Sequence, residues 1–248
     1  MSPPHKLDEV RRLEELAFRG WPALESRDLD GWRLRFSNGY TKRANSINAL
    51  EENSSTDIEA LEAPYRARGQ RPVWRLSPLA PAVMPELLAA RGYSNVERSL
   101  VQHCPLHEGF TPDPVVEIQP QPTPVWIEAF CTHSPVRPEH RETMERMLAA
   151  IAAPKGFALV QHEGRPMAMA IGAVEGDHMG LFDVLVMPEA RRQGLARRVT
   201  ESLYAWAWQQ GARFAYLQVV AANAATLPLY EAQGFRTIYA YSYWLPPA

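Results

Sequence analysis

The stretch that decides the fold is Val184-Leu185-Val186-Met187-Pro188-Glu189-Ala190-Arg191-Arg192-Gln193-Gly194-Leu195-Ala196-Arg197-Arg198. It predicts an apolar strand, a turn rich in arginine and a long helix that begins at the glycine. A helix start presents free backbone N–H groups and the positive end of the helix dipole. Because arginine side chains repel that end, four of them within eight residues indicate an anion in front of the helix. Gly194 and Ala196 let a phosphate approach the main chain, so we expect a pyrophosphate there.

Length and composition are compatible with one large domain or two small ones. The chain has 248 residues, 46% of them hydrophobic, and a formal net charge of −2. This charge gives no reason to expect nucleic acid or a membrane as a partner. The segment from Met1 to Lys6 lacks the apolar core of a signal peptide. Cys104 and Cys131 have neither metal-type spacing nor a CxxC partner, so we expect a reduced, cytoplasmic protein.

The first half of the chain alternates between helical and strand patterns. Apolar periodicity predicts helices over 7–19, 58–68 and 81–90, and strands over 31–36, 40–50, 73–76 and 96–103. A proline-rich passage then runs from Pro105 to Pro124, with a short strand over 115–118. We place a domain boundary within this passage, which divides the chain into domains 1–108 and 109–248.

The second half continues the alternation with longer elements. We expect helices over 125–132, 139–152, 195–210 and 224–233, and strands over 157–162, 167–174, 179–187, 213–220 and 236–245. The strand over 179–187 leads directly into the arginine-glycine turn. The helix over 195–210 carries one apolar stripe, which predicts that it packs on a sheet.

This order of elements resembles the GNAT superfamily of acetyl-CoA-dependent N-acetyltransferases. The Q/R-x-x-G-x-G/A signature of that family is matched by Arg191, Gly194 and Ala196, and its second signature by residues 223–235. The resemblance covers about residues 114–246. It implies an α+β fold with three-layer character, in which helices flank a mixed, mostly antiparallel central sheet. It also implies acetyl-CoA as the co-substrate, without a metal.

The resemblance implies roles for particular residues on the coenzyme side. The main chain of Val184, Leu185 and Val186 would pair with the pantetheine arm, and one amide there would stabilise the oxyanion. Asn223 would contact the pantetheine, or it could cap the helix that follows. Tyr230 matches the general acid of the family, or it could be a core tyrosine. The pyrophosphate would bind the amides of Arg191, Arg192, Gln193, Gly194, Leu195 and Ala196.

The general base departs from the pattern of one related group. The ribosomal-protein alanine acetyltransferases carry a glutamate where this chain has Gln218, and glutamine does not accept a proton at neutral pH. This difference argues against the same protein substrate. A water chain, Asp183 or Glu175 could deprotonate the amine instead, although either carboxylate could equally be a surface or turn residue.

The acceptor side is suggested by residues of the first half and by one loop of the second. Trp32, Arg43 and Asn45 gather around one hairpin, which could wall an acceptor cleft between domains or be an ordinary amphipathic hairpin. Arg137 could hold a substrate carboxylate or be a solvated loop arginine. The histidines have no metal-ligand spacing, so we expect no metal site.

A short internal similarity suggests a tandem protein. Residues 87–93 resemble residues 229–235, but Leu88 stands at the place of Tyr230 and the first half has no RxxGxA turn. This pattern favours a smaller, degenerate GNAT-like N-terminal domain that has lost its cofactor site. Chance similarity of a short repeat is the alternative.

These observations predict an enzyme that transfers an acetyl group directly to the primary amine of a small molecule. One alternative is a peptide or protein-lysine acetyltransferase. The other is a non-catalytic acyl-CoA-binding sensor or interaction module. The identity of the amine is left open, and both a monomer and a homodimer are compatible with the sequence.

Overall fold

The computed structural model describes residues 4–134 and 136–247 of the chain. The elements of the first half are α1 (Pro4–Gly20), β1 (Glu25–Leu29), β2 (Trp32–Phe36), β3 (Ile47–Ala49), α2 (Ile58–Arg66), β4 (Trp74–Leu76), α3 (Met84–Ala90) and β5 (Ser94–Pro105). Those of the second half are β6 (Val116–Gln119), α4 (Pro124–His133), α5 (Arg141–Ala149), β7 (Lys155–His162), β8 (Arg165–Glu175), β9 (His178–Val186), α6 (Leu195–Gln209), β10 (Phe214–Val220), α7 (Leu227–Ala232) and β11 (Arg236–Leu245).

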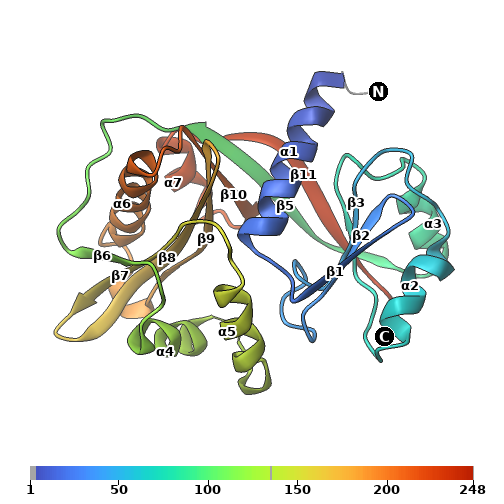
Figure 1. Ribbon diagram of the computed structural model, residues 1–248, viewed down its shortest axis with the longest axis horizontal. Coiled ribbons are helices and arrows are strands. Elements are labelled where there is room, and N and C mark those ends of the chain that lie inside the picture. The colour runs from blue at the N-terminus through green and yellow to red at the C-terminus, as the bar shows by residue number, and fades with distance from the viewer. Residues whose placement is uncertain (1–3, 135, 248) are drawn as a thin grey trace.

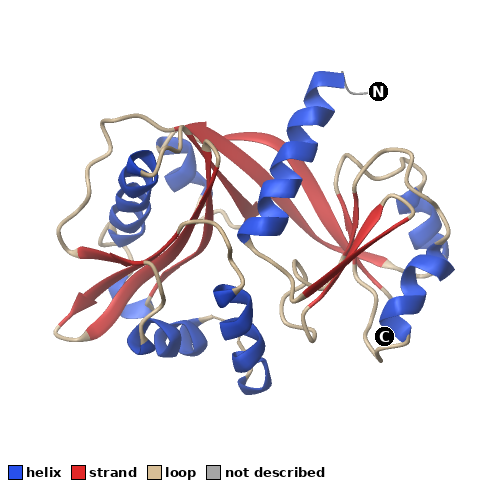
Figure 2. Cartoon of the chain, viewed as in Figure 1, coloured by secondary structure: helices blue, strands red, loops and turns tan. Residues whose placement is uncertain are grey.

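The eleven described strands form one sheet in the order β1-β2-β3-β4-β11-β5-β10-β9-β8-β7-β6. The β3–β4 and β9–β10 pairs are parallel, and the other described pairs are antiparallel. Helices flank the sheet, as Figure 2 shows. The predicted fold class, a mixed and mostly antiparallel sheet flanked by helices, is confirmed.

Helices cover both faces of the sheet in the second half. Successive strand residues point to opposite faces, and β7 shows what each face meets. A Cβ added at Gly156 would lie 3.4 Å from side-chain atoms of Leu203 and Trp206 on α6. The next residue, Phe157, packs edge-to-face with Trp126 of α4, with 5.2 Å between ring centroids. α6 therefore lies on one face and α4 on the other.

Two long strand pairings join the halves of the molecule. In Figure 1, β5 and β11 run side by side from the α6–α7 region to the α2–α3 region. β5 pairs with β10 on one edge and with β11 on the other, and β11 also pairs with β4. Strand pairing therefore crosses the boundary placed between residues 108 and 109. The division into domains 1–108 and 109–248 stays a prediction.

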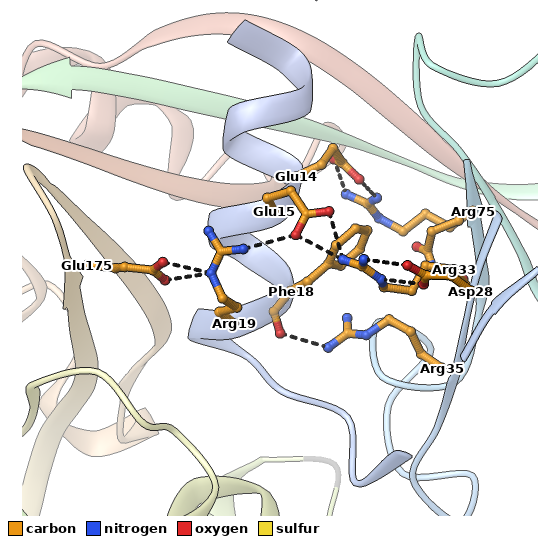
Figure 3. Close-up of polar contacts among 10 residues, drawn as sticks. Glu14, Glu15, Phe18, Arg19, Asp28, Arg33, Arg35, Arg75 and Glu175 are labelled. Atoms are coloured by element: carbon orange, nitrogen blue, oxygen red, sulfur yellow. Dashed lines mark hydrogen bonds and ion pairs between the residues drawn. The ribbon is translucent and has the colours of Figure 1, made fainter. Parts of the chain in front are cut away.

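Helix α1 lies between the halves and is bonded to both (Figure 3). Toward the second half, Arg19 Nε donates to both carboxylate oxygens of Glu175, at 2.7 and 2.9 Å. Toward the first half, Glu14 forms a buried ion pair with Arg75 of β4. Glu14 also accepts a hydrogen bond from the hydroxyl group of Tyr239 on β11. α1 therefore connects two parts of the sheet through charged side chains.

Two segments of the first half differ from the predicted elements. β1 is added beside β2, and its exposed, polar sequence carries no alternating pattern that would predict a strand. The return strand expected over 40–50 shortens to β3. The reason is Asn45, whose Oδ1 accepts the N–H groups of Ser37 and Gly39 and whose Nδ2 donates to the carbonyl groups of Tyr40 and Thr41.

Candidate active site

The parallel strands β9 and β10 separate halfway along their length. They pair from His178 with Phe214 to Leu181 with Leu217. Beyond these pairs β9 continues to Val186 and β10 to Val220, with no further pairing between them in the described chain. The facing edges therefore present backbone N–H and C=O groups that another extended group can bind.

A β-bulge in β9 lies where the strands separate. The register between β8 and β9 shifts between the pairs Met169 with Leu185 and Ile171 with Phe182, which leaves one extra residue on β9. Within it, Asp183 adopts the left-handed conformation with φ 47°. Such bulges bend a strand and redirect its side chains, and here the redirected side chain is a carboxylate.

The arginine-glycine turn connects β9 to α6 with left-handed backbone at two positions. Arg192 has φ 62° and Gly194 has φ 74°. A Cβ added at Gly194 would find no atom within 4 Å, so the space in front of the helix is open. Within the described residues, the amides from Arg192 to Arg197 have no backbone acceptor, and no side chain caps the helix. This is the geometry of an anion site.

The four arginines of the turn divide into two pairs. Arg197 bonds Glu201 on the same helix, at 2.7 Å. Arg198 makes a two-pronged contact with Asp113, at 2.5 and 3.0 Å. The sequence predicts that all four arginines face an anion. Only Arg191 and Arg192 are available for this role, because they are exposed and pair with no carboxylate among the described residues.

The second signature forms the loop after β10 and the short helix α7. The helix begins later than expected, with Thr226 as its N-cap residue. Asn223 is therefore not the helix cap: its carbonyl accepts the N–H groups of Thr226 and Leu227, and its side chain is exposed. Tyr230 is 7% exposed, and its ring lies 5.8 Å from the ring of Phe235.

A cavity of about 160 Å³ lies at the opening between β9 and β10. Side chains of both halves of the chain line it. The loop between β2 and β3 therefore lies beside β9 and β10. The lining residues are Trp21, Thr41, Lys42, Arg43, Glu97, Ser99, Asp183, Gln218, Val220, Tyr241 and Tyr243. The cavity thus combines two acidic, two basic and two phenolic groups in one small volume.

The family described as "Probable histone acetyltransferase Rv0428c C-terminal" matches residues 8–244 of this chain. The chain belongs to this family. The match extends through the first half, beyond the region that carries the sequence signatures. The uncharacterized N-acetyltransferase YobR of Bacillus subtilis is 27% identical over 248 residues, which cover 96% of this chain and 98% of that protein.

Solved structures confirm the GNAT fold. A GCN5-related N-acetyltransferase from Kribbella flavida superposes with a TM-score of 0.69 at 16% identity, over 96% of this chain and 95% of that one. A tandem GNAT protein from the clavulanic acid biosynthesis pathway gives a TM-score of 0.63 at 13% identity, over 94% of this chain and 86% of that one. The protein is an acetyltransferase of the GNAT type, a superfamily that uses acetyl-CoA.

The acetyltransferase holds two titratable groups near the bulge in shifted states. Burial raises the pKa of Asp183, and the nearby charge of Arg43 partly opposes the shift. Burial, together with the negative charge of Asp183, raises the pKa of Tyr230 to about 12. Tyr230 therefore keeps its proton at neutral pH, while Asp183 is a stronger base than an exposed aspartate.

Only part of the acceptor side expected from the sequence lies at this cavity. Arg43 does. Trp32 is fully buried, donates its indole N–H to the carbonyl of Ser55 and packs against Trp74, so it belongs to the core. Asn45 is also buried and bonds four backbone groups of its own loop. Neither side chain is available to an acceptor at the cavity.

The remaining two candidates lie elsewhere. Arg137 is exposed and its closest carboxylate is Glu139, at 3.5 Å. Glu175 is held by Arg19 at the turn before β9. Glu175 is the last residue of β8 and pairs with His178 at the start of β9, whereas Asp183 lies five residues further along β9, so the two carboxylates are well separated. Of the two candidate bases, the structure places Asp183 at the cavity.

The local sequence does not predict that several of the cavity residues belong to a site. Trp21 directly follows α1, Ser99 lies within β5, and Tyr241 and Tyr243 lie within β11. The alternation of β11 predicts that its tyrosines share one face of the sheet. It does not predict that this face lines the cavity near β9. Their positions follow from the pairing of β11 with β5, which joins segments more than 130 residues apart.

Among the described residues, no group of three or more His, Cys, Asp or Glu side chains is arranged to hold a metal ion. No helix in this part of the chain combines the length and apolarity needed to cross a bilayer.

Proposed function

We propose that this acetyltransferase transfers the acetyl group of acetyl-CoA directly to the primary amine of a small molecule. The observation that carries the proposal is the cavity at the splayed end of β9 and β10, with Asp183 inside it and an anion site at the start of α6. Acetyl-CoA would supply the activated acetyl thioester. The chain itself would supply binding groups, a base and an acid.

The residues present fit the coenzyme. The amides from Arg192 to Ala196 and the side chains of Arg191 and Arg192 would bind the pyrophosphate. The unpaired edge of Val184, Leu185 and Val186 would pair with the amide groups of the pantetheine arm. Asn223 lies in the loop after β10 with an exposed side chain, which would form a hydrogen bond with the same arm. These features support one coenzyme per chain.

The proton transfers follow from the same geometry. Asp183 would accept a proton from the substrate ammonium, which frees the nitrogen lone pair for attack on the acetyl carbon. A backbone N–H of β9 would hold the negative charge that develops on the carbonyl oxygen. As the carbon–sulfur bond breaks, Tyr230 would donate its hydroxyl proton to the sulfur, and the second proton of the attacking nitrogen would return to the Tyr230 oxygen. Asp183 would then release its proton to water. The products are an N-acetylated amine and a thiol.

The protonation state of Asp183 affects the acidity of Tyr230. The charge of Asp183 is one cause of the raised pKa of Tyr230. When Asp183 takes the substrate proton, that charge disappears and Tyr230 becomes a better acid. The base would thus prepare the acid for the following step.

Two other functions remain alternatives. The description of the family as a probable histone acetyltransferase supports a peptide or protein-lysine acceptor. The small volume of the cavity, which Trp21 and the loop before β3 help to line, favours a small molecule instead. A non-catalytic acyl-CoA sensor would bind the coenzyme and show no turnover. A tandem origin, with a degenerate N-terminal domain, is part of the proposal.

We expect acetyl-CoA to raise the unfolding temperature. A ligand at 100 times its Kd stabilises a protein by about 2.7 kcal/mol. Gly194→Ala should weaken this effect because its Cβ enters the space before α6, and we expect a Kd about tenfold higher. Gly164→Ala is the matched control, with φ 75° and no atom within 4 Å of the added Cβ. Calorimetric titration measures both; no binding by the wild type would refute the proposal.

We expect Asp183→Asn to lower kcat/KM about 10²-fold at neutral pH, a typical contribution of a general base. In the wild type the carboxylate form exists only above a pKa that is raised from its ordinary value. Activity should therefore fall as the pH drops through that raised pKa, and the variant should lack this acidic limb. The measurement is kcat/KM against pH; an unchanged acidic limb in the variant would assign the base to another group.

A further inference from the structure

We propose that the acceptor is a small zwitterion whose ammonium group binds Asp183 and whose carboxylate binds Arg43. This inference rests on the proposed function, because it names the substrate class of the same cavity. It assigns to Arg43 the carboxylate-binding role that the sequence suggested for Arg137.

Arg43 is an arginine without an anion. It belongs to the loop between β2 and β3, and its guanidinium lies over the ring of Trp21, 6.0 Å from the centroid. Its Nε is buried and has no hydrogen-bond acceptor among the described residues. A buried donor without a partner costs about 1–3 kcal/mol, and more when it is charged. The Arg43 side chain lines the cavity and its Nη groups donate to no acceptor among the described residues, so a ligand oxygen there would satisfy them.

The neighbouring Arg35 and Arg75 also have a buried Nε without an acceptor, but the Nη groups of both are engaged within the protein. Arg75 forms an ion pair with Glu14. Arg35 donates to the main-chain carbonyls of Phe18, Trp21 and Arg43. Both guanidinium groups are therefore engaged within the protein, and both lie outside the lining of the cavity.

A second donor faces the same space. The Tyr241 hydroxyl donates to Oε1 of Gln218, at 2.9 Å. Nε2 of Gln218 is then buried without a partner among the described residues. Arg43 and Gln218 thus both line the cavity and hold N–H groups without an acceptor among the described residues. A carboxylate has two acceptor oxygens, which suits two donors better than a single hydroxyl or amide does.

The charges of the cavity favour a zwitterion. Lys42 and Glu97 neutralise each other, with 2.8 Å between Nζ and Oε2. Arg43 and Asp183 remain as one cation and one anion, which influence each other without forming an ion pair. A ligand that carries both charges would compensate each of them. A simple amine would leave Arg43 without an anion, and a peptide N-terminus or a lysine side chain would do the same.

The size of the space agrees with this class. An engineered protein cavity of about 150 Å³ holds one benzene molecule. At about 160 Å³, this cavity suits the head of a small amino acid or a similar amino-carboxylic acid.

The test compares matched acceptors. Each of the twenty L-amino acids is assayed beside its C-terminal amide, by release of the coenzyme thiol. For the best amino acid we expect kcat/KM at least about 30-fold above that of its amide, since hydrogen bonds to charged groups contribute on that scale. Arg43→Gln should reduce this preference below about threefold. Arg27→Gln, on the exposed strand β1, is the control and should keep it.

A second measurement does not depend on turnover. The N-acetyl derivative of the preferred amino acid and of its amide are titrated calorimetrically into the wild type and the Arg43→Gln variant. Tighter binding of the free acid, lost in the variant, supports the inference. Acetylation of amines without regard to a carboxylate would overturn it and leave the proposed function standing. Failure of the wild type to bind acetyl-CoA would overturn both.

Discussion

Replacement of Tyr230 by phenylalanine is expected to lower kcat about 10³-fold while leaving the Kd of acetyl-CoA within about twofold. General acid catalysis contributes about 10²–10⁴-fold, and the thiolate of the coenzyme would leave without a proton in the variant. Tyr230 is buried against Phe235, so removal of its hydroxyl leaves the packing of α7 intact. The measurements are steady-state kinetics on a good acceptor and calorimetric titration of acetyl-CoA.

Tyr216→Phe is the matched control for this variant. Tyr216 is also buried, lies on β10 and packs edge-to-face with Phe182, 6.1 Å between centroids. Its loss should change kcat less than threefold. The pH profile offers a further distinction. Removal of the acid should remove an alkaline limb from the wild-type profile, where a merely structural tyrosine would leave the shape unchanged. Equal rates for wild type and Tyr230→Phe would disprove the acid role.

Replacement of Glu14 by glutamine is expected to lower the free energy of unfolding by about 3–5 kcal/mol, the range for removing one partner of a buried ion pair. Both side chains of the Glu14–Arg75 pair are 2% exposed. Arg75 would then stay buried as an unpaired cation, close to Arg35. Tyr239 would also lose a carboxylate acceptor that lies 2.5 Å from its hydroxyl.

Glu15→Gln provides the comparison on the same helix. Glu15 pairs with Arg19 and Arg33, but its side chain is 31% exposed. Solvent-accessible pairs contribute only about 0–1 kcal/mol, so this variant should lose less than about 1 kcal/mol. Urea unfolding gives both values from the midpoint and the slope. A small loss for Glu14→Gln would mean that water or another group compensates Arg75.

The Glu14–Arg75 pair also bears on the cavity. The Arg75 guanidinium lies 3.6 Å from the centroid of the Tyr241 ring, and Tyr241 lines the cavity and holds Gln218. A loss of Glu14 would therefore disturb the acceptor side as well as stability. This links the position of α1 to the shape of the substrate space.

The coenzyme side could be predicted from the sequence because its parts are nearly contiguous. The strand edge, the arginine-glycine turn and the start of α6 occupy residues 184–196, and the glycine and the helix pattern are visible locally. The second signature adds Tyr230 in the expected helix. The sequence could not show which arginines face the anion. Arg197 and Arg198 form ion pairs with Glu201 and Asp113, and no spacing rule predicts these contacts.

The acceptor side could be predicted only in part, because long-range strand pairing assembles it. Arg43 comes from a loop of the first half, Asp183 from a bulge and Tyr241 from the last strand. The sequence suggests the hairpin around Trp32 and Asn45 as a wall of the acceptor cleft or as an ordinary amphipathic hairpin, and burial keeps both side chains out of the cavity. Trp32 fills the core, and Asn45 replaces strand pairing with side-chain bonds.

The central position of β11 has a consequence for biosynthesis. β11 lies between β4 and β5, so these strands have exposed edges until the last residues of β11 emerge from the ribosome. Most of the chain must therefore wait for its final strand before the sheet can close. Contacts of such large sequence separation slow folding, and open strand edges favour association between nascent chains. The same insertion that brings Tyr241 to the cavity thus leaves the edges of β4 and β5 open until β11 has been synthesised.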